Sequence, residues 1–249
     1  MKLQSYLNER RVILIMNSTR KKLFCIPYAG GSAMIFNRWK EHVNDNIDII
    51  NIELSGRGAR FNEPLYDSFS DIIDDLSTIV INQIGDSEFA FFGHSLGGLL
   101  AYELSYIIKG KINRNPFHMF LSGVNAPMLK EEKTFLHLIS NEELKDLIKK
   151  MGGTPDEILN NEKVFDVFLP IIRSDFKAYD TYRYSTKFDK LNCDISILNG
   201  DKDNCIDYLK LSTWKERTSK NCYFYKFIGG HFYFLENVDK VVNIINNTI

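Results

Sequence analysis

Apolar and polar positions divide this chain into two kinds of segment. Short, nearly continuous apolar runs, typical of strands buried on both faces, lie at residues 22–27, 47–54, 88–92, 117–122, 194–198 and 222–228. Between them, apolar residues recur every three or four positions, which predicts helices at 34–42, at 69–84, after residue 95 and at 238–249. Strands that alternate with helices predict an α/β fold, with a mostly parallel central sheet and helices on both faces.

The alternation breaks over residues 126–188. This block contains helical patterns at 141–150, 155–160 and 164–179. It shows no convincing strand. Helices that interrupt a strand series near a catalytic end are candidates for a lid that excludes water and shapes a pocket. We therefore expect a single domain over 1–249 with a helical lid inserted at 126–188, hinged at Gly152-Gly153; a fixed extra packing layer is the alternative.

Composition and charge are those of an ordinary globular domain. Of the 249 residues, 44% are hydrophobic and 25% charged, and the formal net charge of −1 does not indicate nucleic-acid binding. Arg10 and Arg11 precede only five apolar residues, too few for a signal peptide, and no stretch approaches the ~20 apolar residues of a membrane span. We expect residues 1–16 to be a dispensable extension, with Met16 as an alternative start.

The four cysteines lack the spacing of a metal site or a disulfide framework. They are Cys25, Cys193, Cys205 and Cys222. Cys25 and Cys222 lie inside predicted strands, where a free thiol behaves as a small hydrophobic group. Reduced thiols predict a cytoplasmic protein.

The strand at 88–92 runs directly into Gly93-His94-Ser95-Leu96-Gly97, a G-x-S-x-G sequence followed by a helical pattern. A serine hydroxyl becomes an effective nucleophile when a sharp turn presents it to a base and to amide donors. Glycines on either side of Ser95 allow strand and helix to approach closely around a strained serine. The context therefore predicts a nucleophile elbow; a structural turn that contains a serine is the alternative.

An acid and a histidine follow the last two predicted strands. Asp201 and Asp203 come after the first of these strands, with Asp207 further along, and His231 comes after the second. The order Ser…Asp…His is that of α/β-hydrolases, and the carboxyl ends of parallel strands meet at one edge of a sheet. We expect Ser95, Asp203 and His231 to form a catalytic triad, with Asp203 preferred over Asp201 for its spacing from Gly200.

The other histidines are not expected to take part. His118 lies within a strand and is expected to be a core residue, whereas His42 and His137 lie on helical segments and are expected to be exposed. His94 adjoins the nucleophile, but a tight turn directs its side chain elsewhere.

The first strand ends in Tyr28-Ala29-Gly30-Gly31, a loop whose backbone can approach a ligand closely. In hydrolases with a nucleophile elbow, such a loop supplies one amide of the oxyanion hole, and the residue after the nucleophile supplies the other. We expect the N–H groups of Ala29 and Leu96 in these roles. A phosphate-binding loop is the competing interpretation, but no G-K-[ST] or G-x-G-x-x-G pattern supports it.

Six short stretches together resemble, in order, the motifs of type II thioesterases, the stand-alone editing hydrolases of nonribosomal peptide and polyketide synthases within the α/β-hydrolase superfamily. They are residues 27–31, 54–58, 93–98, 122–127, 169–176 and 229–231. The similarity extends from about Leu23 to the C-terminus. One departure is Ser55, where the family usually has proline; it leaves the chemical groups unchanged.

The resemblance implies an α/β-hydrolase fold with a helical lid, and it places the acid on Asp203. It implies hydrolysis of acyl thioesters on the phosphopantetheine arm of carrier proteins, which removes misprimed or stalled acyl groups during antibiotic or siderophore biosynthesis. It further implies a cytoplasmic monomer without a metal or cofactor, whose partner is a carrier protein. Basic residues of the lid block are candidate contacts for an acidic carrier, or else a solvated face: Lys145, Lys149, Lys150, Arg173 and Lys177.

The same fold supports three other functions. A general carboxylesterase or lipase shares the acyl-enzyme route, so a triad alone does not distinguish it. An acyltransferase replaces water with an alcohol or amine. A binding protein with a hydrolase fold is disfavoured, because nucleophile, base, acid and oxyanion loop are all represented.

Overall fold

The computed structural model describes residues 20–127, 135–184 and 189–249. The expected N-terminal extension, with Met16, lies outside the described residues, as do 128–134 and 185–188 of the expected lid.

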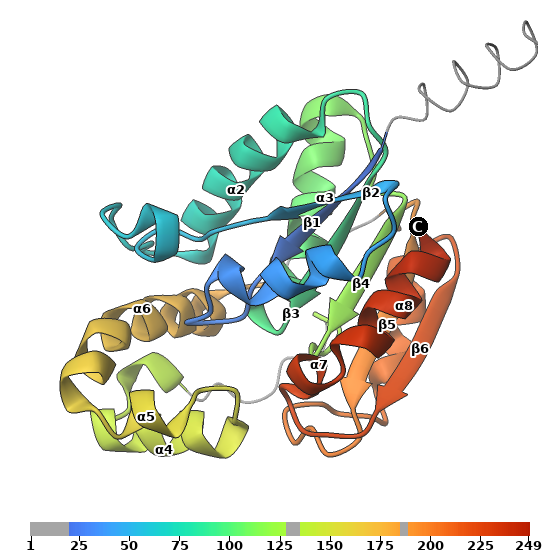
Figure 1. The fold of residues 1–249 in the computed structure, drawn as a ribbon. Helices are drawn as coiled ribbons and strands as arrows, with labels where there is room; N and C mark the ends of the chain where they lie inside the picture. The colour runs from blue at the N-terminus through green and yellow to red at the C-terminus, as the bar shows by residue number, and fades with distance from the viewer. Residues whose placement is uncertain (1–19, 128–134, 185–188) are drawn as a thin grey trace, which may run out of the picture.

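A six-stranded parallel sheet forms the centre of the molecule, with the strand order β2-β1-β3-β4-β5-β6 (Figure 1). Every neighbouring pair is parallel, which confirms the predicted sheet. All six predicted strands are present, with ends shifted by a few residues: β1 Lys21–Ile26, β2 Ile47–Asn51, β3 Phe89–His94, β4 His118–Ser122, β5 Asp194–Gly200 and β6 Cys222–Phe227.

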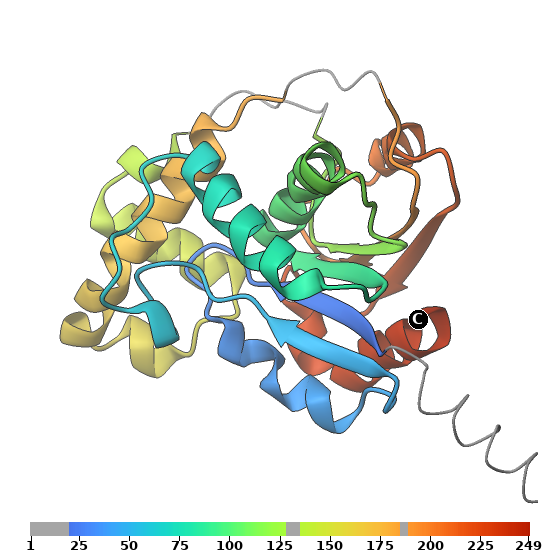
Figure 2. The same ribbon diagram turned by 90° about the horizontal axis from the view of Figure 1, so that it is seen from above.

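Helices cover both faces of the sheet (Figure 2). One face packs against α2 (Phe69–Ile84), α3 (Leu96–Ile112) and the 3₁₀ helix η4 (Leu211–Arg217). The other packs against η1 (Ala33–Glu41), α7 (Tyr233–Glu236) and α8 (Val238–Thr248). Neighbouring residues of β3 point to opposite faces, Phe91 into the first core and Phe92 into the second, so an unbroken apolar run is what a doubly covered strand requires.

Local sequence explains where the clearest helix begins and ends. The Ser68 side chain accepts a hydrogen bond from Asp71 N–H at the start of α2, and Gly85 follows its last residue with a positive φ. The predicted helix at 34–42 forms instead as the 3₁₀ helix η1. The short η2 (Gly58–Arg60), η4 and α7 are not predicted by the apolar pattern.

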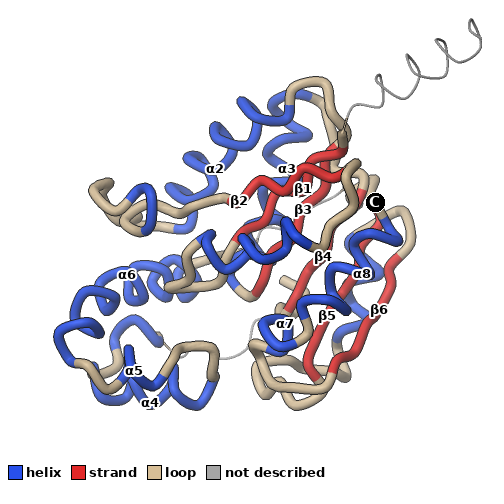
Figure 3. Tube along the Cα trace, viewed as in Figure 1, coloured by secondary structure: helices blue, strands red, loops and turns tan. Residues whose placement is uncertain are grey.

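Between β4 and β5 the described chain is helical, as Figure 3 shows. This block contains η3 (Leu136–Leu138), α4 (Asn141–Met151), α5 (Asp156–Leu159) and α6 (Glu162–Thr181). It has a small apolar core of its own, made by Leu144, Ile148, Leu159, Phe165, Ile172 and Phe176. The three predicted helices are therefore present; the movement of the block as a lid stays a prediction.

None of the four cysteines forms a disulfide. Burial raises the pKa of Cys25, which keeps this thiol protonated within the sheet. None of the helices among the described residues combines the length and the apolar character needed to cross a membrane.

Candidate active site

Ser95 lies at the sharp turn between β3 and α3. Its φ of 53° and ψ of −117° are unfavourable for a residue with a side chain. A Cβ on Gly93 would lie 2.2 Å from the carbonyl oxygen of Gly97, and a Cβ on Gly97 would lie 2.2 Å from that of Ile26. Both contacts are to backbone, so only glycine permits this approach of strand, helix and first loop.

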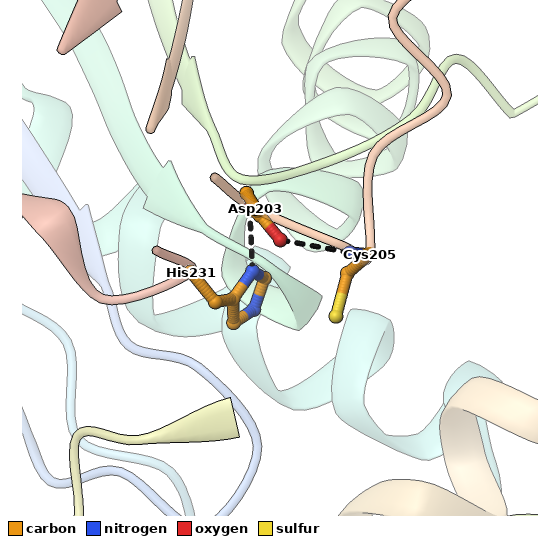
Figure 4. Close-up of side chains that lie close together, drawn as sticks. All are labelled: Asp203, Cys205 and His231. Atoms are coloured by element: carbon orange, nitrogen blue, oxygen red, sulfur yellow. Dashed lines mark hydrogen bonds and ion pairs between the residues drawn. The ribbon is translucent and has the colours of Figure 1, made fainter. Parts of the chain in front are cut away.

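His231 and Asp203 are hydrogen-bonded to each other. The Nδ1 of His231 lies 2.8 Å from Oδ2 of Asp203, and both residues are buried (Figure 4). The amide of Cys205 donates to Oδ1 of the same carboxylate at 2.9 Å. With both oxygens engaged, the carboxylate is held in one orientation and fixes that of the imidazole. No protein atom among the described residues bonds to the buried Nε2 of His231.

The two competing aspartates serve the backbone instead. Asp201 accepts a hydrogen bond from the amide of Gly229 at 3.0 Å, which closes the turn before His231. Asp207 accepts one from the amide of Leu209 at 3.1 Å. The structure therefore pairs His231 with Asp203.

One apolar cavity of about 380 Å³ has both Ser95 and His231 in its wall. The lid block supplies much of the opposite wall, including residues of α4, α5 and α6. The lid residues are Ile148, Met151, Gly152, Gly153, Thr154, Pro155, Ile158, Phe165, Phe168, Ile172 and Phe176. Such a lining accommodates an apolar chain next to the serine.

The loop after β1 also lines the cavity through Tyr28, Ala29, Gly30 and Gly31. Leu96 is the first residue of α3, where amides have no partner within their helix. The helix N-terminus also favours negative charge. The two expected oxyanion donors therefore lie on segments that meet at Ser95.

A second histidine lies behind His231. His94 is fully buried, its ring centroid is 4.8 Å from that of His231, and its Nδ1 lies 2.9 Å from the hydroxyl of Ser122. That hydroxyl in turn lies 2.6 Å from the hydroxyl of Tyr233. Burial, and then the proximity of His231, hold the pKa of His94 well below its usual value, so the ring is neutral. Its side chain packs beneath the base and does not reach the cavity lining, as expected from the turn.

The remaining histidines divide differently from the prediction. His118 is buried in β4 beside the hydroxyl of Ser196, as expected for a core residue. His42 is exposed. The exposure expected for His137 is wrong: its side chain is only 15% exposed, because Nδ1 lies 2.7 Å from the carboxylate of Asp180 on α6.

A metal ion is the other ligand to consider here. One ligand atom from each of Asp203, Cys205 and His231 lies within 4.8 Å of the others. Both carboxylate oxygens already accept hydrogen bonds, from His231 and from the amide of Cys205. This arrangement suits an acid that orients a base.

An elbow serine and a histidine–aspartate pair at the carboxyl ends of a parallel sheet define a serine hydrolase with the α/β-hydrolase fold. Residues 21–249 match the model of the thioesterase domain family, and the chain therefore belongs to the thioesterase family. The predicted fold, family resemblance and thioesterase activity are confirmed.

Three relatives illustrate this membership. Gramicidin S biosynthesis protein GrsT of Aneurinibacillus migulanus is 32% identical over 97% of this chain and 94% of its own length. The crystal structure of ClbQ from the colibactin NRPS/PKS pathway superposes with a TM-score of 0.88, at 32% identity, covering 92% of this chain and 96% of ClbQ. BorB, the type II thioesterase from the borrelidin biosynthetic cluster, has a TM-score of 0.84 at 30% identity, covering 92% of each chain.

Proposed function

We propose that this thioesterase hydrolyses acyl thioesters carried on the phosphopantetheine arm of carrier proteins and so releases misprimed or stalled acyl groups in nonribosomal peptide or polyketide biosynthesis. The observation that carries the proposal is that Ser95 and His231 line the same apolar cavity. Relatives that belong to such pathways support the substrate class.

In the proposed reaction, Ser95 Oγ attacks the thioester carbonyl while Nε2 of His231 takes its proton. The amides of Ala29 and Leu96 stabilise the oxyanion, and the C–S bond breaks to release the pantetheine thiol, which receives the proton. Water then attacks the acyl-serine with His231 again as base, which gives the free acid and restores Ser95. Asp203 holds the imidazole tautomer and stabilises the imidazolium through Nδ1.

The site supplies a nucleophile, a base, an acid and amide donors, which together suffice for acyl transfer to water. We therefore propose that neither a metal nor a cofactor takes part. The enzyme acts as a monomer whose carrier contact is transient.

The basic residues of the lid differ in their availability for a carrier. Arg173 donates hydrogen bonds to the carbonyls of His137 and Ile139, so it serves the lid itself. Lys177 pairs with Asp67. Lys149 and Lys150 are exposed in the last turn of α4, and we propose this pair as the carrier contact.

The experiment measures release of acetyl and longer acyl groups from a loaded carrier protein by the wild type and by Ser95→Ala. Ser70→Ala, on the exposed surface of α2, is the matched control. We expect release to fall by at least about 10³-fold in Ser95→Ala and to stay unchanged in Ser70→Ala. Activity retained in Ser95→Ala contradicts the assignment.

Matched oxyesters and alcohol or amine acceptors test the competing activities. Cleavage of simple oxyesters without release from the carrier would identify an esterase. Transfer products with an added acceptor would identify an acyltransferase.

A further inference from the structure

A buried ion pair joins two of the sequence motifs that the triad does not use. Arg57 lies in the loop after β2, and Asp175 lies on α6, 118 residues away. The guanidinium contacts the carboxylate with both terminal nitrogens, Nη1 to Oδ2 at 2.5 Å and Nη2 to Oδ1 at 2.8 Å. The side chains are 3% and 0% exposed, respectively.

The same pair holds the loop that carries Ala29. Oδ2 of Asp175 accepts a hydrogen bond from the amide of Gly30 at 2.7 Å, and Nη1 of Arg57 donates to the carbonyl of Gly31 at 3.3 Å. One side chain thus binds an N–H of the loop, and the other binds a C=O one residue later. Buried charges are tolerated when further hydrogen bonds engage them, and this loop supplies those bonds.

The loop is also pressed against α6. Gly30 has a φ of +77°, and a Cβ at this position would lie 2.7 Å from the side chain of Ile172. Ile172, on α6, also lines the cavity. The position of the loop is therefore set by a helix of the lid block as well as by β1.

Other bonds tie α6 to the body of the protein without reaching this loop. The hydroxyl of Ser174 donates to the carbonyl of Tyr66 at 2.7 Å, and Lys177 lies 3.4 Å from the carboxylate of Asp67. Of these neighbouring tethers on α6, Asp175 is the one that contacts the segment with the expected oxyanion donor. A purely structural role does not require that contact.

We propose that Arg57 and Asp175 are positioning residues that orient the N–H of Ala29 toward the oxyanion. A peptide group is planar, so a hydrogen bond that fixes the N–H of Gly30 also fixes the carbonyl end of Ala29 and restricts the rotation of the preceding amide. Small errors in a donor's position weaken its hydrogen bond to a developing charge. This inference rests on the proposed role of Ala29.

The first test compares Asp175→Asn with Ser174→Ala. Each variant removes or weakens one buried tether of α6, but only the first alters the acceptor of the Gly30 amide. For hydrolysis of p-nitrophenyl acetate, which needs Ser95 and the oxyanion hole but no carrier, we expect kcat to fall about 10- to 100-fold in Asp175→Asn, with KM changed less than about 3-fold. Ser174→Ala should keep kcat within about 2-fold.

A trifluoromethyl ketone provides a second readout, because its tetrahedral adduct with Ser95 presents an oxyanion. Its Ki should rise in Asp175→Asn by the same factor as kcat falls, since both report stabilisation of that charge. Weaker binding of this inhibitor without a matching loss in kcat would overturn the proposal.

The double variant Arg57→Met/Asp175→Leu separates positioning from stability. Apolar replacement of a buried ion pair often preserves stability, so we expect a Tm near that of the wild type. The kcat should nevertheless stay low, because no acceptor remains for Gly30 N–H. Recovery of kcat together with Tm, or equal losses in Asp175→Asn and Ser174→Ala, would show that the pair is merely structural.

Arg57→Lys keeps the charge but not the two-nitrogen contact, and we expect an intermediate kcat. Acyl release from a carrier is measured separately. A chain that cleaves p-nitrophenyl acetate with the expected variant pattern, yet does not unload a carrier, would contradict the proposed substrate while supporting the role of Arg57 and Asp175.

Discussion

The two walls of the cavity are built differently. The wall with Ser95 and His231 lies at the end of the sheet, over a core of fully buried aromatic rings that includes Trp39, Phe92 and Phe234. The lid wall consists of helices around six buried apolar residues, with Leu138 and Val167 of the same block exposed. Catalytic groups thus occupy the more deeply packed wall, and the residues expected to contact the acyl chain occupy the less packed one.

This difference follows from what each wall must do. A nucleophile and its base need fixed positions, which neighbouring strands and close-packed rings provide. An acyl pocket must admit and release its ligand, which favours elements with few buried contacts. Substitutions on the sheet wall should therefore affect kcat and stability, whereas those on the lid wall should affect the choice of substrate.

The largest expected effect is that of Gly97→Ala. The new Cβ would meet the carbonyl oxygens of Ile26 and Pro27 at 2.2 and 2.5 Å, and backbone cannot move aside without separating β1 from α3. We expect a loss of about 3 kcal/mol in the free energy of unfolding and no measurable turnover.

Gly152→Ala, on the lid wall, is the matched control for that substitution. Apart from its chain neighbours, no atom of the described residues lies within 4 Å of its Cβ position, so the φ of +80° is what opposes the change, at about 1 kcal/mol. Urea unfolding and turnover of both variants measure the contrast; similar losses in the two would contradict it.

Asp203→Asn should lower kcat on the order of 10³-fold with little change in Tm. An amide of the same size fits the site, but it no longer stabilises the imidazolium or selects the tautomer with a proton on Nδ1. Asp201→Asn is the control, because Asp201 serves the amide of Gly229. Comparable losses of kcat in both variants would argue against Asp203 as the acid.

The protein should become less stable in acid because of a buried histidine in the sheet. Burial lowers the pKa of His118 to about 4, whereas in the unfolded chain it is about 6.5. Below pH 6.5, His118 therefore binds a proton in the unfolded state but not in the folded state. The free energy of unfolding declines down to about pH 4, by roughly 3 kcal/mol. His94, which is also buried and neutral, acts in the same direction.

The measurement is Tm against pH for the wild type and for His118→Phe. The variant loses the contact with Ser196 but should show a flatter decline between pH 6.5 and 4. Ser70→Ala, at an exposed position of α2 and without a titratable side chain, should leave the slope unchanged. If the Tm of His118→Phe falls with pH as steeply as that of the wild type, protonation of His118 is not the cause of the decline.

The smallest expected effect concerns the lid wall. Ile158→Trp should fill part of the 380 Å³ cavity and raise KM for a decanoyl thioester about 10-fold, while acetyl turnover stays within about 2-fold. The Tm should change little, because Ile158 is only half-buried. An equal loss of activity on the decanoyl and acetyl thioesters would show that the lid wall contributes directly to catalysis. The two walls would then not differ in function.

Sequence-based prediction succeeded where a single local cause dominates. The strands follow from apolar runs, and the elbow follows from two glycines around Ser95, since no other residue allows the contacts of Gly93 and Gly97. It failed where the pattern is short or ambiguous: α7 has four residues, too few for periodicity, and η1 shares its spacing with an α-helix. It also placed His137 in solvent, because nothing nearby in the sequence announces its partner Asp180.

The sequence by itself determined the order of strands and helices, the elbow and the family, because these depend on residues close together or on motifs in a set order. Spacing and the family resemblance also favoured Asp203 over Asp201, and the structure shows the contacts: the loop after β5 directs Asp203 to the imidazole and Asp201 to a backbone amide. Only the tertiary structure decided which distant charges meet. Arg57 contacts Asp175, 118 residues away, because a buried charge needs an opposite charge beside it. The sequence around either residue does not indicate which distant residue is its partner.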